Sequence, residues 1–225
     1  MKDTLWQHII YRCVIGSRAY GLDDADSDTD RRGIYLPPAD LHWSLSGVPE
    51  QLENETTQEC YWELQKFITL ALKANPNILE CLYTPLVEFA SPIAQELLTM
   101  RDRFLSRQVY GTYQGYVQSQ FKRLEIDLRT RGEVRWKHAM HLIRLQIAGT
   151  QALREGAIHV DMSPYRDRLI QIKHGQMPWQ QIDAWRAELG SEFDAAFATT
   201  QLPDQPDHTW ANSFLIKARR SAISS

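Results

Sequence analysis

Hydrophobic and polar residues follow two different periods along the chain. In the N-terminal third, residues 9–15 (IIYRCVI) form an apolar, β-branched run that stops at Gly16, which predicts a buried strand. A short helix is expected before this run, from Asp3 to His8, and residues 30–38 (DRRGIYLPP) predict a second strand ended by two prolines. From residue 39 to residue 61 the pattern favours loops, with a third candidate strand near Thr56 to Cys60.

Further along, the apolar positions recur every three to four residues. Residues 61–75 predict a helix that ends at Asn75 and Pro76, because its apolar side chains share one helical face: Leu64, Phe67, Ile68, Ala71 and Leu72. Residues 77–85 predict a further short apolar element. From about Pro92 onward helical spacing dominates, in segments 92–105, 107–132, 135–156, 177–200 and 209–222.

These patterns predict an α+β fold, with a small mixed β-sheet followed by a helical half. We expect a first domain at residues 1–90 and an α-helical domain at residues 91–225. A length of 225 residues suits one large domain or two small ones.

Composition narrows the class of protein. Hydrophobic residues make up 43% and charged residues 24%, which is typical of a globular protein, and a net charge of -3 excludes a globally basic nucleic-acid coat but not a local basic face. The three cysteines form no zinc-binding spacing, so a cytoplasmic setting is expected. No segment has the ~20 apolar residues of a membrane helix or the features of a signal peptide, so no membrane association is expected.

Candidate chemistry concentrates in GSRAYGLDDADSDTDRRGIY, residues 16–35. Asp28 and Asp30 are two residues apart at the start of a predicted strand, so both carboxylates would point to one face, roughly 7 Å apart. That spacing suits one divalent cation or a pair of cations ~4 Å apart, and carboxylate oxygens favour Mg²⁺ or Mn²⁺. Gly16 and Ser17, directly after the first strand, could hold phosphate oxygens through backbone N–H groups and a hydroxyl.

Each part of this pattern has an alternative interpretation. A Gly-Ser pair by itself indicates only a turn, and DSDTD by itself suits a solvated loop or a loose calcium loop. An EF-hand is excluded, because its loop needs Gly at position 6 and Glu at position 12 and no frame supplies both. The combination is more specific: strand, Gly-Ser, about ten residues, Ser-Asp-x-Asp, strand.

Residues 16–38 resemble the nucleotidyltransferases of the DNA polymerase β superfamily. Residues 61–85 (YWELQKFITLALKANPNILECLYTP) and 137–145 (KHAMHLIRL) are similar to its RNA-repair-associated, polymerase β-like branch of predicted nucleotidyltransferases. The resemblance covers most of the chain and is strongest over residues 14–85. It implies a palm-like catalytic domain at residues 1–90, with the helical domain closing the nucleotide cleft.

The resemblance also implies a site. Asp28 and Asp30 would bind two Mg²⁺ (or Mn²⁺) ions, and Gly16 and Ser17 would hold the phosphates of ATP or another nucleoside triphosphate (NTP). A third carboxylate on a nearby strand would complete the metal site. Glu59 is the chosen candidate and Glu55 is the alternative, while Glu63 is expected to lie on the helix.

Three further residues near the loop could contact phosphate. Arg18 follows the Gly-Ser turn, and Ser27 directly precedes the first aspartate; a surface arginine and a turn cap are the alternatives. Arg32 would share the face of Asp28 and Asp30 and could pair with a carboxylate or a phosphate.

The helical half offers one candidate face. Lys137, His141 and Arg144 are spaced i, i+4 and i+7, which suits either a lining for the triphosphate or base, or a solvated amphipathic helix. A basic cluster could contact an RNA backbone: Arg129, Arg131, Arg135 and Lys137. A row of tyrosines could stack bases or form core: Tyr110, Tyr113 and Tyr116.

We therefore expect a metal-dependent nucleotidyltransferase that transfers a nucleoside monophosphate from an NTP to an acceptor hydroxyl and releases pyrophosphate. An RNA end, tRNA-like or broken, is the favoured acceptor. Protein nucleotidylation, as in adenylyltransferases and antitoxin-like enzymes, is one alternative. A non-catalytic nucleotide-binding regulatory module is the other.

Overall fold

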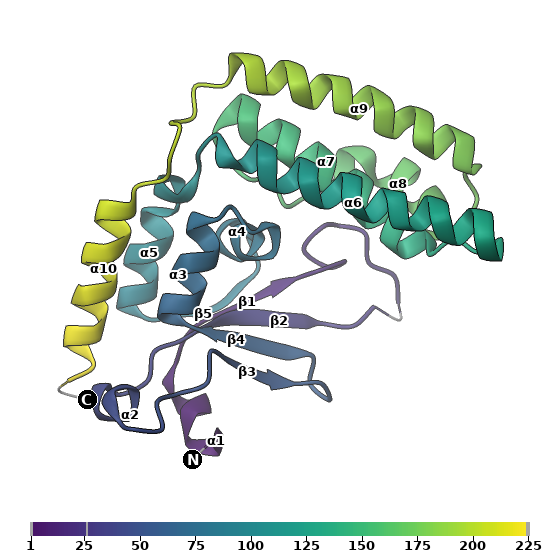
Figure 1. Ribbon diagram of the computed structural model, residues 1–225. Coiled ribbons are helices and arrows are strands. Elements are labelled where there is room, and N and C mark those ends of the chain that lie inside the picture. The colour runs from purple at the N-terminus through teal and green to yellow at the C-terminus, as the bar shows by residue number, and fades with distance from the viewer. Residues whose placement is uncertain (1, 26, 224–225) are drawn as a thin grey trace. The chain divides into compact units, whose positions relative to one another are not determined.

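A five-stranded mixed sheet organises the N-terminal third of the protein (Figure 1). The computed structural model describes residues 2–25 and 27–223. The strand order is β3-β4-β2-β1-β5, in which β2 and β4 are parallel and the other neighbours are antiparallel. The strands are β1 (Ile9–Ile15), β2 (Asp30–Tyr35), β3 (Gln51–Asn54), β4 (Glu59–Glu63) and β5 (Val87–Ala90).

Helices make up most of the rest of the chain, which confirms the predicted α+β class. The α-helices are α1 (Lys2–Leu5), α2 (Ala39–Trp43), α3 (Leu64–Leu72), α4 (Pro76–Tyr83), α5 (Pro92–Thr99), α6 (Gln108–Arg131), α7 (Trp136–Glu155), α8 (Arg166–Lys173), α9 (Trp179–Thr199) and α10 (His208–Ser221). Within the described residues, short 3-10 helices are formed by Trp6–His8, Arg101–Phe104 and Ser163–Tyr165. No helix within the described residues is both long and apolar enough to cross a membrane.

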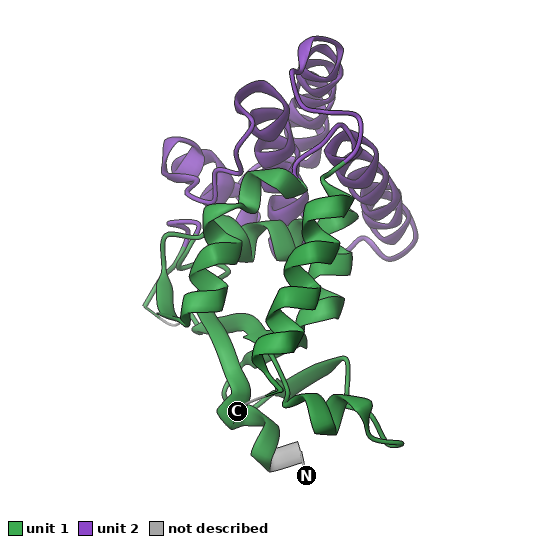
Figure 2. Ribbon diagram, turned by 90° about the vertical axis from the view of Figure 1, so that its left-hand side faces the viewer, with its two compact units in different colours: residues 1–19, 23–104, 206–225 green, residues 20–22, 105–205 purple. Residues whose placement is uncertain are grey.

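The chain divides into two compact units, coloured separately in Figure 2. Unit 1 contains residues up to 19, residues 23–104 and residues from 206 onward, and therefore the whole sheet, α3–α5 and α10. Unit 2 contains residues 105–205, with α6–α9, and the separate segment 20–22. Both α5 and α10 thus belong to the unit with the sheet, although their sequences lie beyond the predicted domain boundary at residue 90.

The sheet of unit 1 is covered on both faces, which explains why β1 is a nearly continuous apolar run. On one face, the Tyr11 hydroxyl donates to the Cys81 carbonyl of α4 at 2.6 Å. On the opposite face, four buried side chains form a core cluster: Leu5, Tyr35, Leu52 and Tyr61.

The β4–α3 junction differs from the predicted helix of residues 61–75. Tyr61 and Trp62 pair in β4, and α3 begins only at Leu64, because the Glu63 carboxylate accepts hydrogen bonds from the N–H groups of Gln65 and Lys66 and so caps the helix. Likewise Asn75, expected to stop a helix, caps the start of α4, with its side chain accepting from the Ile78 N–H.

The β3–β4 hairpin occupies a segment for which the sequence favoured loops. Its turn is stabilised by Asn54, whose Oδ1 accepts from the backbone N–H groups of Thr56 and Thr57 at 3.0 and 3.3 Å. The candidate strand near residues 56–60 is therefore the turn plus the start of β4.

Within unit 2, the long helices α6, α7 and α9 pack around a shared core. Tyr113 is fully buried, and the Tyr110 ring stacks on Phe197 of α9 with centroids 4.1 Å apart. Both tyrosines therefore serve helix packing. Tyr116 of the same row is 39% exposed.

Candidate functional site

The turn after β1 brings Gly16 against Asp30. Ile15 pairs with Asp30 across the β1–β2 ladder, so the chain leaves one strand where the other begins. Gly16 has φ +79°, and a Cβ added to it would lie 2.5 Å from Asp30 Oδ2. A side chain at position 16 would therefore be strained and would collide with the carboxylate, so the sequence needs glycine here.

The two aspartates of the predicted pair have different environments. Asp30 is the first residue of β2 and its side chain is 32% exposed. Asp28 precedes the strand and is exposed, so strand alternation does not fix the direction of its side chain. Within residues 2–25 and 27–223, no three histidine, cysteine, aspartate or glutamate side chains gather closely enough to hold a metal ion.

Hydrogen bonds join the two ends of the loop that runs from the Gly16 turn to Asp28. Arg18 Nη2 donates to the Ser27 carbonyl at 2.7 Å, joining the two ends of the loop. Ser27 Oγ donates to Asp24 Oδ1 at 2.7 Å and accepts from the Asp24 N–H at 3.0 Å. Arg18 and Ser27, both predicted as phosphate contacts, therefore hold the loop in this structure.

The two arginines of β2 point to opposite faces of the sheet, as strand alternation requires. Arg31 forms an ion pair with Glu88 of β5 at 3.0 Å. Arg32 lies on the face of Asp30, and its Nη2 is 3.4 Å from Asp30 Oδ1. Its Nη1 donates to the carbonyls of Arg31 and Gln58 at 2.8 and 2.9 Å, so the guanidinium is fixed beside the carboxylate.

Glu59, the candidate third carboxylate, lies on the opposite face from Asp30. In the parallel β2–β4 ladder Glu59 pairs with Arg31, and paired residues share a face. There its Oε1 accepts from the Tyr61 hydroxyl at 2.9 Å, which in turn accepts from Arg12 Nε at 2.8 Å. Burial raises the pKa of Tyr61, so the hydroxyl keeps its proton and donates a hydrogen bond to Glu59. The strand register therefore puts Glu59 and Asp30 on opposite faces of the sheet.

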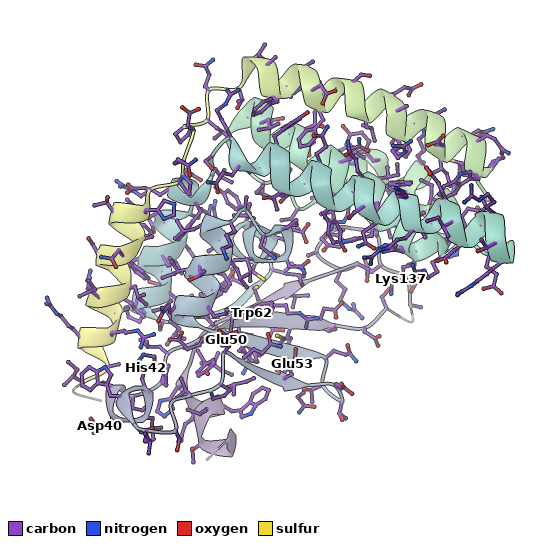
Figure 3. The ribbon with its side chains drawn as sticks, viewed as in Figure 1. Asp40, His42, Glu50, Glu53, Trp62 and Lys137 are labelled. Carbon is purple, nitrogen blue, oxygen red and sulfur yellow. The ribbon has the colours of Figure 1, made fainter. Side chains whose placement is uncertain are left out.

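Glu53 of β3 is the carboxylate on the Asp30 face that the sequence analysis missed. Arg32 pairs with Cys60 and Cys60 pairs with Glu53, so these three side chains form one row across the sheet. All three line a cavity of about 160 Å³, together with Glu59 and the hairpin turn. Figure 3 shows Glu53 on β3. The missed signal is the turn sequence NETT, which predicts a hairpin and hence a strand before it.

Cys60 separates Arg32 from Glu53 in this row but is not a reactive thiol. Burial raises its pKa to about 11, and the neighbouring Glu53 carboxylate adds to this effect. The side chain is therefore neutral at physiological pH and contributes shape rather than chemistry.

The three polar residues predicted on one helical face differ in exposure. All three lie on α7 in unit 2: Lys137 is exposed, His141 is half-buried and Arg144 is fully buried. Arg144 Nη2 lies 3.2 Å from His141 Nδ1. Burial, the Arg144 charge and His138 lower the pKa of His141 to about 3, so its imidazole is neutral and accepts this hydrogen bond. The basic cluster remains exposed at Arg129, Arg131, Arg135 and Lys137.

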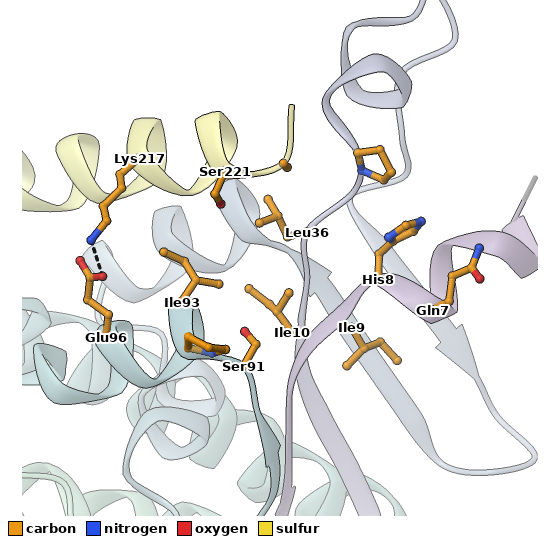
Figure 4. Close-up of a pocket in the computed structure, with 13 residues that line it drawn as sticks. Gln7, His8, Ile9, Ile10, Leu36, Ser91, Ile93, Glu96, Lys217 and Ser221 are labelled. Carbon is orange, nitrogen blue, oxygen red and sulfur yellow. Dashed lines mark hydrogen bonds and ion pairs between the residues drawn. The ribbon is translucent and has the colours of Figure 1, made fainter. Parts of the chain in front are cut away.

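A separate cavity of about 560 Å³ lies at the other end of β1 (Figure 4). It is lined by His8, Ile9 and Ile10 near the strand's start, and the Lys217–Glu96 ion pair closes one side at 2.5 Å. A seven-residue strand spans ~20 Å, so this cavity is remote from the Gly16 turn.

The sheet thus carries the Gly-Ser turn directly after β1 and an aspartate at the start of β2. The chain belongs to the RNA repair pathway DNA polymerase beta family, whose model matches residues 2–217. This confirms the resemblance seen in the sequence. The name of the family points to a polymerase β-like nucleotidyltransferase in RNA repair.

Two curated relatives are themselves uncharacterised. The protein YcgL of Bacillus subtilis (strain 168) is 34% identical over 97 residues, which cover 41% of this chain and only 37% of YcgL. The protein MJ0002 of Methanocaldococcus jannaschii is 22% identical over 221 residues, which cover 89% of each chain. No solved structure matches the chain significantly.

Proposed function

We propose that the protein is a metal-dependent nucleotidyltransferase that transfers a nucleoside monophosphate from an NTP to an acceptor hydroxyl. The observation that carries this proposal is the Gly16 turn packed against Asp30 at the start of β2. It supplies a side-chain-free backbone for phosphate oxygens next to a half-buried carboxylate.

The residues near this turn fit Mg²⁺ or Mn²⁺ in their donor chemistry. Asp28 and Asp30 offer carboxylate oxygens, and Mg²⁺ usually binds one or two carboxylates and completes its shell with water and substrate phosphates. Such a shell needs no cluster of three protein ligands beforehand. When bound, the ions would neutralise charge on the oxygens of the reacting phosphoryl group.

Different residues of the chain would bind and orient the reacting groups for an in-line displacement. Backbone N–H groups at Gly16 and the Ser17 hydroxyl bind the triphosphate, while Arg32 fixes the Asp30 carboxylate. The acceptor oxygen forms a bond to the α-phosphorus as the bond to pyrophosphate breaks. No covalent enzyme intermediate is required.

We further propose Glu53, in place of Glu59, as the third carboxylate. Both glutamates line the cavity beside Arg32, but Glu53 shares the sheet face of Arg32, whereas Glu59 accepts a hydrogen bond from Tyr61 on the other face. A carboxylate in this position would accept the proton of the attacking hydroxyl.

An RNA end is the acceptor that we favour. Two features support it: the RNA-repair description of the family and the exposed basic cluster where α6 ends and α7 begins. The test is to incubate the purified protein with each α-labelled NTP, Mg²⁺ or Mn²⁺, and total RNA or total protein. We expect label on an RNA 3′ end. Label on protein alone would identify a protein acceptor, and no label with any NTP or acceptor would contradict the proposal.

A further inference from the structure

The loop from Gly16 to Thr29 is shared between the two units. Its ends lie in unit 1, but its tip, Tyr20–Leu22, belongs to unit 2 and is coloured with that unit in Figure 2. Tyr20 is 7% exposed and Leu22 is fully buried. Loop tips are usually exposed and mobile, whereas the large side chains of this tip are buried and pack against the rest of the protein.

Three hydrogen bonds hold the backbone of this tip. The Met162 N–H donates to the Tyr20 carbonyl at 2.9 Å. Arg166 Nη1 donates to the Gly21 carbonyl at 3.0 Å, and Lys173 Nζ donates to the Leu22 carbonyl at 3.3 Å. All three carbonyls of the tip are therefore held by residues of the same unit, two of them by cationic donors from α8.

Gly21 lets the tip approach Asp161 and Ser163 closely. Its φ is +67°, and a Cβ at this position would lie 2.8 Å from Ser163 Oγ and 3.1 Å from Asp161 Oδ1. Asp161 itself accepts from the Ser163 N–H and hydroxyl at 2.9 and 2.6 Å, so the two side chains next to Gly21 are hydrogen-bonded to each other.

Arg144 holds the side chain of the tip. Its guanidinium carbon lies 3.7 Å from the centroid of the Tyr20 ring, a stacked cation–π arrangement. Arg144 is fully buried, and neutral His141 accepts a hydrogen bond from it. Arg144 was one of three residues of α7 expected to line the triphosphate, but in the structure its guanidinium stacks on the Tyr20 ring.

We propose that this attachment, which we call the loop anchor (Tyr20–Leu22 with Arg144, Arg166 and Lys173), positions the phosphate turn, and that Arg144 is a positioning residue acting through Tyr20. Tyr20 follows Ser17 by three residues, a reach of about 10 Å at most. The Arg18–Ser27 hydrogen bond ties the two ends of the loop, so a change at the tip reaches Ser17 and Asp28 together. The consequence for nucleotide binding rests on the proposed function.

The anchor itself is tested without nucleotide. Hydrogen exchange is measured over residues 16–30 in Arg166→Ala and, as a matched control on the same helix, Arg168→Ala. Arg168 stacks on Trp185 at 3.7 Å instead of holding the loop. We expect exchange to rise by about threefold or more in Arg166→Ala and to stay at the wild-type level in Arg168→Ala. Equal exchange in both variants would overturn the anchor even if the protein binds no nucleotide.

The positioning role is tested by a double-mutant cycle on the NTP KM. Arg144→Met and Tyr20→Leu should each raise KM by roughly tenfold with a smaller change in kcat, and the double variant should be no worse than either one. Tyr20→Phe keeps the ring and should restore a near-wild-type KM.

Two results would make Arg144 a direct phosphate contact and overturn its positioning role. One is additive effects on KM in the double variant, and the other is an unchanged KM in Tyr20→Leu together with a raised KM in Arg144→Met. If Arg144→Met does not fold, the Tyr20→Leu and Tyr20→Phe pair still decides: equal KM values for both would overturn the role.

Discussion

Single residues set the geometry of the phosphate turn, and Gly16 is the most constrained of them. Its backbone is left-handed and its missing side chain leaves the space that Asp30 occupies. Two separate physical demands therefore select glycine at this position, and they can be measured separately.

Gly16→Ala should destabilise the protein more than Gly47→Ala. Both glycines have positive φ, +79° and +59°, but a Cβ at position 47 meets nothing within 4 Å. The control therefore measures the backbone strain alone, on the order of 1 kcal/mol. The collision with Asp30 should add about 1–3 kcal/mol to the loss for Gly16→Ala in urea unfolding. Equal losses for the two variants would show that Asp30 can move away freely.

His141 makes stability depend on pH. Its folded pKa is depressed to about 3 from an ordinary 6.5, so its contribution is complete above pH 6.5 and is lost as the pH falls toward 3. In this window the loss is about 1.4 kcal/mol for each pH unit. His141→Gln should therefore flatten the stability curve between pH 6.5 and 4.5, measured by urea unfolding. Equal slopes in wild type and His141→Gln would contradict a neutral His141.

At the scale of elements, the β3–β4 hairpin decides which glutamate faces Asp30. Its register puts Glu53 in the row of Arg32 and Glu59 in the row of Arg31. Because side chains alternate along a strand, a shift of one residue in the pairing would exchange the two faces.

Glu53→Gln and Glu59→Gln should separate catalysis from stability. Glu53→Gln should lower kcat by roughly 100-fold through loss of a proton acceptor, with little change in unfolding. Glu59→Gln should leave kcat near wild type and cost about 1 kcal/mol through the weaker hydrogen bond from Tyr61. The reverse assignment of kinetic effects would restore Glu59 as the third carboxylate.

The ion pair between α10 and the β4–α3 junction should matter for stability. Arg219 Nη2 donates to Glu63 Oε1 at 2.9 Å, and the Glu63 side chain is 7% exposed. Arg219→Ala leaves that carboxylate buried without its cationic partner, so the free energy of unfolding in urea should fall by about 3 kcal/mol. Lys217→Ala on the same helix breaks the exposed pair with Glu96 and should cost about 0–1 kcal/mol. Similar losses would mean that Glu63 is satisfied by its helix-capping bonds alone.

Hydrophobic periodicity was enough to predict the strongly patterned elements. β1, β2 and the helices α6, α7, α9 and α10 follow from it, because burial of one face imposes the period. β3 has four residues and only one buried side chain, Leu52, so it carries almost no pattern. The eight-residue α8 was missed as well, with Leu169 and Ile172 its only buried residues.

The sequence predicted the positions of candidate site residues only where they lie on two strands that follow each other in the chain. Gly16 and Asp30 meet because β1 and β2 are neighbours, which their sequences indicate. The face of Glu59 depends on the register of β4 with β2, a long-range pairing that local sequence does not encode. Arg144 shows the same limit, since helical spacing gives its face on α7 but not the loop that covers it.

At the scale of the whole molecule, the chain order interleaves the two units. Unit 1 is completed by α10 from the C-terminus, and unit 2 includes three residues of the loop between β1 and β2. A cut at residue 90 would therefore remove α5 and α10 from unit 1 and separate Tyr20–Leu22 from the rest of unit 2.

The rate of label transfer from an α-labelled NTP, compared between wild type and Asp30→Asn, tests the central claim most directly. Asp40→Asn, an exposed aspartate on α2, is the control for loss of a negative charge. The account predicts Mg²⁺-dependent transfer by wild type and Asp40→Asn, and a loss of at least about 1,000-fold in Asp30→Asn with the fold intact. Transfer by Asp30→Asn at the wild-type rate would contradict it.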